Sequence, residues 1–412
     1  MECIFNLELD EPEQSDESDD EYIEKDEQVH NAFDLSPVFD EETDAFDANI
    51  EYKVSSRKIG WKDFKCLKSI GYGAFGKVYL VKKITGKDQG NLFAMKILRK
   101  DVISQKEKDI RYTKAERNIL GAIKHPFIVD LFYAFQTKGN LYLVLEFIRG
   151  GDFYLYLVKE KMLLEDSACF YAAEVTLAFE FLHKEGIIYR DLKPENILID
   201  ADGHVKLVDF GLCKEEIYDG CITYSFCGTI DYMAPEVISR NGHGKAADWW
   251  SLGTLMYTML TGKAPFCCEN KKSLMQLILK QKVSYPKFIT EDARDLMQRL
   301  MKRPVKKRLG SGPDDAEPIK KHLFFRNVNW DDLLAKKVVP PYKPEFTSEE
   351  DVSHFDIECT QQVLPDSTDD SVAGSSSNPF KGFSFEAPGY SEEFLRNSAE
   401  SPMKCSFDFR GT

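Results

Sequence analysis

The sequence lacks the long apolar runs that mark proteins in or across membranes. No stretch approaches the ~18 consecutive apolar residues of a membrane-spanning helix, and no charged-then-apolar leader opens the chain. Its ten cysteines form no CxxC pair and share no zinc-ligand spacing with the seven histidines. We therefore expect neither a structural zinc site nor insertion into a membrane. We expect the cysteines to be reduced thiols, which predicts a cytoplasmic protein, with the nucleus as the alternative compartment.

Positive charge is almost absent from the beginning of the chain. Residues 1–51 contain 20 acidic side chains and a single basic one, Lys25, so the net charge of −15 comes from this segment. Residues 52–412 carry a net charge of +4 and no basic stripe with interleaved aromatic residues, which argues against nucleic-acid binding. So acidic a segment buries too little apolar surface to offset its ordering entropy. We expect residues 1–60 to be a disordered tail.

Strand-like patterns dominate the first half of the remaining chain. Short runs with strand character occur at 64–70, 77–83, 92–98 and 141–147. In the last run Leu141, Leu143 and Leu145 alternate with other residues, which is the period-two pattern of a half-buried strand.

Helical patterns dominate the second half and complete an α+β fold. A first helix is predicted within the β-like part at 112–123, and a second at 167–184, with a cap at Asp166 or Ser167 and a stop at Gly186. A third, at 248–260, is apolar nearly all round, which indicates a buried central helix. A β-rich piece followed by a larger helical piece predicts two lobes with a cleft between them.

The most informative stretch is the octapeptide YRDLKPEN, followed thirteen residues later by the tripeptide DFG. Catalysis of phosphoryl transfer requires that the reacting groups be positioned and that the charge spread over the oxygens of the transferred phosphoryl group be stabilised. Asp191 would accept the hydrogen bond and then the proton of an acceptor hydroxyl, while Lys193 would steady the phosphate. Asn196 and Asp209 would hold Mg²⁺ through hard oxygen ligands. A surface turn rich in Asp and Asn is the alternative, and the joint spacing argues against it.

A glycine-rich stretch, GYGAFGKV at 71–78, predicts a phosphate-binding turn. Glycine lets the backbone approach phosphate oxygens where a side chain would clash. The residues expected to contact the nucleotide here are Gly71, Gly73, Gly76 and Val78. Dinucleotide-binding domains share this pattern, but in them a helix follows, whereas a strand-like run follows here.

Two further segments complete the predicted nucleotide site. Lys96 would pair with the α- and β-phosphates and be oriented by Glu116 on the helix predicted at 112–123. The run LVLEFI would contact adenine through the backbone groups of Glu146 and Ile148, with Leu145 at the rear of the pocket.

In their order, and with APE at 234–236, these motifs resemble the eukaryotic protein kinases over residues 64–325. DLKPEN resembles the serine/threonine branch, and DFGLCK with SFCGTIDYMAPE resembles the group that includes cyclic-nucleotide-dependent kinases, Akt and protein kinase C. The resemblance implies ATP and Mg²⁺ as cofactors. It also implies that Glu236 pairs with Arg308 and that Asp248 holds the catalytic loop.

Both ends of the chain narrow the resemblance to the ribosomal protein S6 kinase family, seventy-kilodalton type. Residues 322–356 and the sequence NPFKGFSF are similar to that family's C-terminal extension and hydrophobic motif. We therefore assign 326–390 to the extension and 391–412 to a short disordered terminus. By the same resemblance Phe355 reaches the adenine pocket.

The sequence IFNLELDEPE near the start is similar to the family's docking signal for the target-of-rapamycin complex. Its alternating apolar side chains are Phe5, Leu7 and Leu9, and Asn6 stands where the family has Asp.

Three serines match regulatory phosphorylation sites of that family. Ser225 precedes FCGT in the activation loop, with Arg190 as its natural partner and a phosphoinositide-dependent kinase as the upstream enzyme. Ser384 lies among three phenylalanines that would dock on the small lobe. Ser367 matches the turn motif, although Thr368 replaces the family's proline.

The resemblance also predicts the substrate class. Asp152 and Glu195 match carboxylates that read an arginine before the acceptor serine or threonine. Thr258 replaces a further acidic position of the family, so the resemblance does not extend to the carboxylate that would read a second arginine. The expected partners are protein substrates with basic serine or threonine sites, ribosomal and translation proteins among them.

The prediction is thus a monomeric serine/threonine kinase that acts in growth and translation control. The alternatives are an Akt-like or serum-regulated kinase and, in another class, a pseudokinase scaffold that binds nucleotide without catalysis. The first sixty residues leave no room for a lipid-binding domain, which disfavours an Akt-like protein. The presence of every catalytic residue type argues against a pseudokinase.

Overall fold

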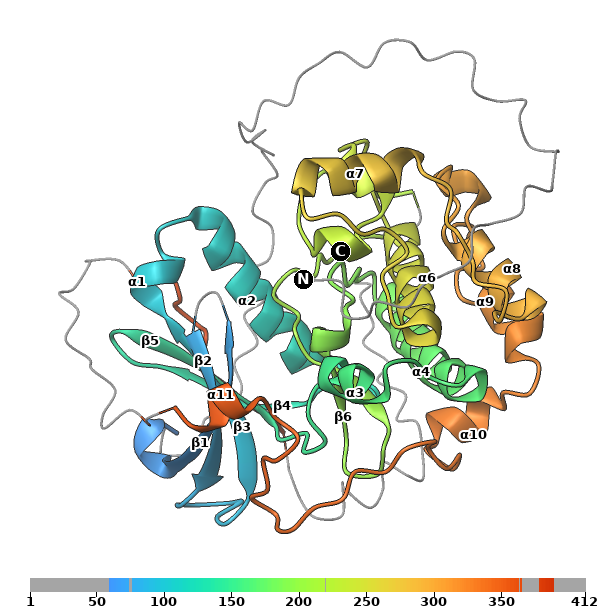
Figure 1. Ribbon diagram of the computed structural model, residues 1–412. Helices are drawn as coiled ribbons and strands as arrows, with labels where there is room; N and C mark the ends of the chain where they lie inside the picture. The colour runs from blue at the N-terminus through green and yellow to red at the C-terminus, as the bar shows by residue number, and fades with distance from the viewer. Residues whose placement is uncertain (1–58, 74–75, 219, 363, 365–377, 389–412) are drawn as a thin grey trace. The chain divides into compact units, whose positions relative to one another are not determined.

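The computed structural model describes residues 59–388, except 74–75, 219, 363 and 365–377 (Figure 1). The predicted docking residues Phe5, Leu7 and Leu9 and the predicted phosphorylation site Ser367 lie outside the described residues. Among the helices that are described, none is both long enough and apolar enough to cross a bilayer.

A six-stranded antiparallel sheet forms the small lobe, in the spatial order β1-β2-β3-β5-β4-β8. The strands are β1 (Phe64–Gly73), β2 (Gly76–Lys83), β3 (Leu92–Arg99), β4 (Leu131–Gln136), β5 (Asn140–Glu146) and β8 (Phe385–Glu386). The four predicted strands are all present. The sequence did not predict β4, because five of its six residues are buried in succession and no alternation marks the strand.

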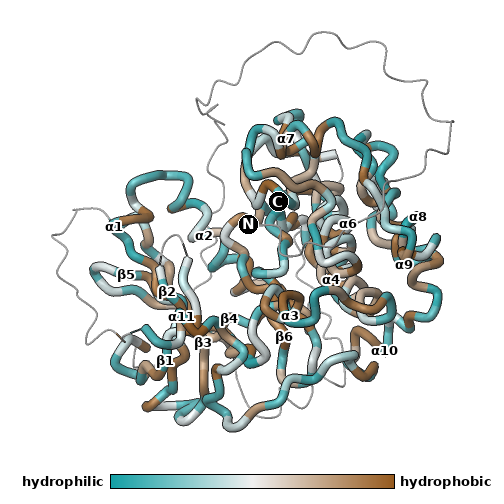
Figure 2. Tube along the Cα trace, viewed as in Figure 1, coloured by the Kyte–Doolittle hydropathy of each residue, from teal (hydrophilic) through white to brown (hydrophobic). Residues whose placement is uncertain are grey.

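The prediction of a half-buried strand at 141–147 is wrong, because β5 is buried on both faces. Leu141, Leu143 and Leu145 belong to the main core of the molecule. The opposite face carries Tyr142 and Val144, which join a second apolar cluster on the other side of the sheet. Figure 2 shows hydrophobic residues along the strands of the small-lobe sheet. With Tyr142 and Val144 between the leucines, β5 is buried at every position from 141 to 145, so the leucine alternation did not mark a half-buried strand.

Two helices follow β3 in the small lobe, α1 (Lys100–Ile103) and α2 (Glu107–Ala122). α2 packs against β4 and begins five residues before the predicted start at Tyr112. Its first turn contains Glu107 and Asp109, whose negative charge is favourable at a helix N-terminus. This polar turn lacks the apolar spacing from which the helix was predicted.

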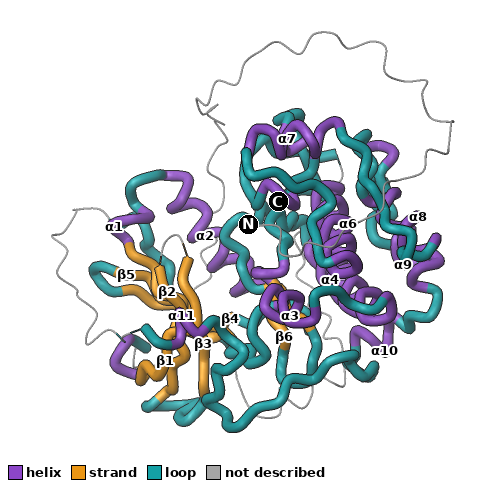
Figure 3. The backbone as a smooth tube through the Cα atoms, in the orientation of Figure 1, coloured by secondary structure: helices purple, strands orange, loops and turns teal. Residues whose placement is uncertain are grey.

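The large lobe is mostly helical (Figure 3). Its helices are α3 (Phe153–Glu160), α4 (Glu165–Lys184), α5 (Pro235–Ile238), α6 (Ala246–Thr261), α7 (Lys271–Lys280), α8 (Glu291–Leu300) and α9 (Glu317–Lys320). A two-stranded sheet of β6 (Ile197–Ile199) and β7 (Val205–Leu207) lies among them. Every residue of α6 except Thr258 is buried, and α6 contacts both α4 and α8. The predicted central helix and the α+β fold class are confirmed.

The predicted cap of the helix at 167–184 is wrong. α4 begins at Glu165, its N-cap residue is Leu164, and no side chain caps it, so Asp166 and Ser167 lie inside the helix. The two acidic residues of its first turn interact favourably with the helix dipole instead. The predicted stop is correct, because Gly186 follows the C-cap with a φ of +71°.

The C-terminal extension returns from the large lobe to the sheet. It includes α10 (Trp330–Leu334), α11 (Ile357–Thr360) and β8, and α11 packs against β1 (Figure 1). Ion pairs accompany its path, with Lys343 3.0 Å from Asp202 in the large lobe and Glu350 3.1 Å from Lys82 in the small lobe. The extension therefore contacts both lobes.

Candidate active site

Lys96, Glu116 and Asp209 meet between the lobes. Lys96 in β3 donates from Nζ to Oε1 of Glu116 on α2 at 2.7 Å and to Oδ1 of Asp209 at 3.2 Å. Burial alone would lower the pKa of the Lys96 ammonium, but the two carboxylates outweigh it and raise that pKa. The charge of Lys96 lowers the pKa of Asp209, so Asp209 is ionised at neutral pH. The pair predicted from the sequence is formed, and Asp209 joins it.

The catalytic loop brings a second set of polar groups together. Asn196 donates from Nδ2 to the backbone oxygen of Asp191 at 2.8 Å and to its Oδ2 at 2.9 Å. The ammonium of Lys193 lies 3.1 Å from Oδ2 of Asp191. The predicted base and the predicted phosphate-binding lysine are therefore adjacent, and Asn196 orients the base.

Thr229 is a site residue that the sequence analysis missed. Its hydroxyl donates to Oδ1 of Asp191 at 2.9 Å and accepts from Nζ of Lys193 at 3.1 Å. The preceding Gly228 has a φ of +107°, and a Cβ there would lie 2.7 Å from the backbone oxygen of Arg190. This close approach needs glycine and carries Thr229 to the catalytic loop. The Gly-Thr pair just before the APE motif was the available signal.

We predict that Thr229→Ala lowers kcat about tenfold or more, because it removes hydrogen bonds to two charged catalytic groups. Thr229→Ser keeps the hydroxyl and should retain most of the activity. The measurement is steady-state phosphate incorporation into a peptide at saturating ATP. Equal kcat for the alanine and serine variants would show that the hydroxyl plays no part.

Asp248 of α6 holds the backbone of the catalytic loop. Its carboxylate accepts from the backbone N–H of Tyr189 and of Arg190, each at 2.8 Å. Arg190 has a φ of +68°, a conformation rare for a side chain of this kind, and these hydrogen bonds help to maintain it. The structure thus agrees with the role that the resemblance implied for Asp248.

The described glycines of the glycine-rich stretch lie at the adjoining ends of β1 and β2, where Gly73 pairs with Gly76. A Cβ on Gly76 would lie 1.7 Å from the backbone oxygen of Ile97, so packing against β3 requires glycine at this position. A Cβ on Gly71 would meet only Val78, at 3.7 Å, and a Cβ on Gly73 would meet nothing within 4 Å. These two glycines leave open space at the end of β1, as an approaching phosphate needs. Val78 pairs in register with Lys96.

The predicted adenine-contacting segment follows the end of β5. Leu145 and Ile148 are buried. Between them the ring of Phe147 stacks on Phe355 of the extension, with centroids 6.0 Å apart and planes 17° apart. The structure therefore brings Phe355 to this segment, as the resemblance implied.

Glu146 is held by both its backbone and its side chain. Its backbone N–H donates to the oxygen of Asp130 at 2.9 Å, and its carboxylate accepts from Nζ of Lys206 at 2.6 Å. Lys206 lies on β7, three residues before Asp209, and so ties this segment to the large lobe.

Asn196 and Asp209 fit the divalent cation that the resemblance implied. Asp209 is ionised, and Asp191 engages the amide nitrogen of Asn196, which leaves its amide oxygen as the group for a cation. In the described part of the chain no three His, Cys, Asp or Glu side chains cluster as metal ligands. Two oxygen-bearing side chains plus substrate phosphates suit Mg²⁺, which retains several non-protein ligands.

The two carboxylates predicted to bind substrate lie near each other. Asp152 is the N-cap of α3 and accepts from the backbone N–H of Leu155 at 2.8 Å. Burial raises the pKa of Asp152 to about 6, with Glu195 contributing through its negative charge. Burial also raises the pKa of Glu195, and its Oε2 is buried with no hydrogen-bond partner among the described residues. A cationic side chain would relieve both carboxylates.

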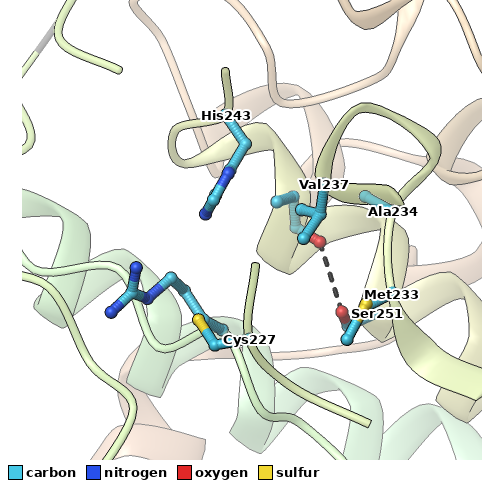
Figure 4. A pocket seen from close by; sticks show the side chains of 8 residues that line it. Cys227, Met233, Ala234, Val237, His243 and Ser251 are labelled. Carbon is cyan, nitrogen blue, oxygen red and sulfur yellow. Dashed lines mark hydrogen bonds between the residues drawn. The ribbon is translucent and has the colours of Figure 1, made fainter. Parts of the chain in front are cut away.

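The activation-loop serine lies at the catalytic loop. The guanidinium of Arg190 donates to the hydroxyl of Ser225 and, through Nε, to the backbone oxygen of Leu212 at 2.6 Å. A pocket lies beside Arg190, lined also by Cys227, Met233, Ala234, Val237, His243, Ala247 and Ser251 (Figure 4). Burial lowers the pKa of His243 to about 4, so its ring is neutral. Among the residues that line this pocket, Arg190 is therefore the one that carries a charge, and it contacts Ser225.

The hydrophobic motif docks on the small lobe, where the resemblance placed it. Phe380 and Phe383 are buried, and β8 pairs with β4. Arg117, next to Glu116 on α2, donates to the backbone oxygen of Phe383 at 3.1 Å and to that of Ser384 at 2.9 Å. The side chain of Ser384 is exposed.

Comparison with known proteins accounts for most of the described chain. Residues 64–325 match the family "Protein kinase domain" and residues 346–385 match "Protein kinase C terminal domain". The chain is 52% identical to "Ribosomal protein S6 kinase beta" of Caenorhabditis elegans over 81% of its own length and 61% of that protein. It is 49% identical to human "Ribosomal protein S6 kinase alpha-1" over 83% of its own length and 46% of the relative. The chain thus spans about half to three fifths of the curated relatives it matches, and it belongs to the protein kinase family.

Proposed function

We propose that the chain is a serine/threonine protein kinase of the ribosomal protein S6 kinase type, which transfers the γ-phosphate of ATP to protein substrates. The observation that carries this proposal is the assembled active site. Lys96, paired with Glu116, lies 3.2 Å from Asp209, and Asp191 is flanked by Lys193 and Thr229. Positioning of this kind supplies most of the catalysis in phosphoryl transfer. The similarity to S6 kinases over about 80% of the chain supports the type.

ATP and Mg²⁺ are the cofactors that a protein kinase domain uses, and the residues here suit both. Asn196 and Asp209 would hold the cation, and Lys96 would contact the phosphates. The cation would neutralise charge on the phosphates, while Asp191 accepts the proton of the substrate hydroxyl.

The assembled site disfavours a pseudokinase scaffold. Such a protein needs to bind nucleotide and partners, but it does not need an oriented base beside a phosphate-binding lysine. Both Oδ atoms of Asp191 accept hydrogen bonds, from Thr229 and Asn196, which orients the carboxylate for proton transfer.

The substrates carry an arginine three residues before the acceptor. Burial disfavours the ionised form of the Asp152 and Glu195 carboxyl groups unless a cation pairs with them. An arginine guanidinium can donate hydrogen bonds to both carboxylates at once. Ribosomal and translation proteins that carry such basic sites are the proposed physiological substrates.

The test is a radiolabel-transfer assay on purified, phosphorylated protein with two peptides that differ only in arginine or alanine at that position. An Asp209→Asn variant serves as the control for metal-dependent transfer. We expect label in the arginine peptide, a lower kcat/KM for the alanine peptide, and none above background for Asp209→Asn. Equal label from the wild type and the variant would refute the activity, and equal kcat/KM for both peptides would refute the arginine preference.

Regulation by two upstream enzymes is part of the proposal. A phosphate on Ser225 would meet Arg190, and the family resemblance names a phosphoinositide-dependent kinase as the enzyme that adds it. The target-of-rapamycin complex binds the segment with Phe5, Leu7 and Leu9 and acts on Ser384. Mass spectrometry of the protein from stimulated cells, with and without an inhibitor of each enzyme, tests both assignments. Unchanged phosphate at either serine would refute that assignment.

We predict that Ser384→Ala lowers activity in stimulated cells with the melting temperature nearly unchanged. The hydroxyl is exposed, so its loss removes no packing, whereas a phosphate would add charge-assisted hydrogen bonds near α2 and favour the Lys96–Glu116 pair. Ser273→Ala, at an exposed position of α7, is the matched control. Full activity of Ser384→Ala after stimulation would contradict the prediction.

We place this kinase in the cytoplasm as a monomer, with the nucleus as the second compartment. The ten cysteines form no CxxC pair, which supports a reducing compartment. Fractionation of cells expressing a tagged chain, with size-exclusion chromatography of each fraction, tests both points. Recovery in a membrane fraction, or as a dimer, would contradict them.

A further inference from the structure

His183, near the end of α4, lies between two carboxylates from distant parts of the chain. Its Nε2 is 3.0 Å from Oδ2 of Asp248 on α6. Its Nδ1 is 2.9 Å from Oδ2 and 3.1 Å from Oδ1 of Asp315, which lies in the loop before α9. The rings of Phe179 and Trp249 cover the imidazole, whose side chain is 0% exposed. The charged groups that face His183 from α6 and from this loop are these two aspartates.

This geometry requires a protonated ring. A neutral imidazole has one N–H, so its second nitrogen would turn a lone pair toward a carboxylate, whereas an imidazolium donates from both nitrogens. Burial by itself lowers the pKa of His183, but the hydrogen bonds and charges of Asp248 and Asp315 outweigh burial and raise that pKa to about 9. His183 is therefore a buried cation at neutral pH.

The buried cation is coupled to catalysis through Asp248. The same carboxylate that faces His183 accepts the backbone N–H groups of Tyr189 and Arg190, and the next residue is the predicted base Asp191. Two amide hydrogen bonds do not neutralise a fully buried carboxylate, but the imidazolium does. The position of the catalytic loop thus depends on the charge of His183.

Asp315 is held in place for this contact. Its Oδ1 accepts from the indole N–H of Trp249 at 2.8 Å, and its backbone adopts a left-handed φ of +46°. The neighbouring Asp314 is exposed, whereas the side chain of Asp315 is only 13% exposed. The two adjacent aspartates therefore have different environments.

We propose that Asp315 is a positioning residue for phosphoryl transfer, which keeps His183 as a doubly donating imidazolium and thereby holds Asp248 and the catalytic loop in place. Its effect on activity rests on the proposed function, whereas its effect on the charge of His183 does not.

The experiment compares the full chain with Asp315→Asn, which keeps the shape but removes the charge, and with Asp314→Asn as the matched control. NMR titration of histidine-labelled protein, with the His183 signal assigned by a His183→Gln variant, measures the pKa directly. We expect the pKa of His183 to fall by about 1–3 units in Asp315→Asn and to stay unchanged in Asp314→Asn.

The pH dependence of kcat at saturating ATP and peptide is the second readout. Folding raises the pKa of His183, so the protonated ring stabilises the folded protein. This stabilisation is complete below the ordinary histidine pKa of about 6.5, and it is lost as the pH rises through about 9, the pKa of His183 in the folded protein. The alkaline limb of the wild-type profile is therefore expected near pH 9, and in Asp315→Asn it should move down by the same amount as the pKa of His183. Asp315→Glu, which keeps a carboxylate, should restore the wild-type limb.

Three results would overturn the proposal. The first is an equal pKa of His183 in the wild type and in Asp315→Asn. The second is a kcat of Asp315→Asn that is lower than that of the wild type by the same factor at every pH. The third is a difference in the alkaline limb between His183→Gln and the double variant His183→Gln/Asp315→Asn. If Asp315→Asn does not fold, a wild-type His183 that titrates near 6.5 would still refute the imidazolium. If the wild type transfers no phosphate, the proposed function is refuted, and the NMR titration alone then tests whether Asp315 sets the charge of His183.

Discussion

Replacing Asp191 with asparagine is expected to lower kcat by about 10²–10⁴-fold with little change in KM for ATP. An amide cannot accept the proton of the substrate hydroxyl, so the loss falls on the chemical step. The fold should survive, because the asparagine oxygen can still accept from the hydroxyl of Thr229 or from Asn196, which now donate to the carboxylate at 2.9 Å each. Steady-state kinetics with ATP and an arginine-containing peptide measure both constants.

The matched control for Asp191→Asn is Asp166→Asn, which changes an exposed acid in the first turn of α4. It alters the net charge equally and should leave kcat within about twofold, as a surface substitution does. A kcat for Asp191→Asn that matches this control would show that Asp191 is not the base.

Replacing Arg308 with methionine is expected to destabilise the protein by about 3–5 kcal/mol. The guanidinium is fully buried and binds Glu236 in two hydrogen bonds, at 2.6 and 2.7 Å. It also donates to the backbone oxygens of Ala246 and Lys302, at 2.8 and 2.9 Å. Its removal leaves the Glu236 carboxylate buried without a counter-ion. Urea unfolding followed by tryptophan fluorescence measures the change.

An exposed ion pair provides the comparison for Arg308→Met. Arg299 and Asp295 lie 2.8 Å apart, but their side chains are 55% and 46% exposed. Arg299→Met should therefore change the stability by about 1 kcal/mol or less. The double variant Arg308→Met/Glu236→Gln should be more stable than Arg308→Met, because the uncompensated charge is gone. Equal costs for Arg308→Met and Arg299→Met would contradict this account.

Within the active site, the residues that share a short stretch of chain were predictable. Asp191, Lys193 and Asn196 lie within one octapeptide, so covalent geometry alone keeps them close. The pairing of Lys96 with Glu116 was also predictable, because a lysine within an apolar strand and a glutamate on the neighbouring helix have few other ways to pack. Thr229 was not predictable in this way, because its contact with Asp191 depends on how Gly228 approaches the backbone of Arg190.

The fold shows the same division between local and distant causes. Strands β1, β2, β3 and β5 were recognised from local pattern, whereas β4 was not, since full burial erased its alternation. Burial of β5 on both faces depends on the second apolar cluster, whose Tyr142 and Val144 give no periodic signal. The cap predicted for α4 failed because acidic residues in its first turn take the place of a capping side chain.

By itself the sequence determined the α+β class and the order of the catalytic motifs, and it predicted which residues would be the base, the phosphate-binding lysine and the cation ligands. Each of these depends on residue type and on spacing along the chain, and both are visible without a fold. Only the tertiary structure decided that Thr229 touches Asp191, that Phe355 stacks on Phe147, and that Asp315 and Asp248 enclose His183. These contacts join segments far apart in the chain, so they exist only where the packing of helices and strands brings buried charges and rings within hydrogen-bonding or stacking distance.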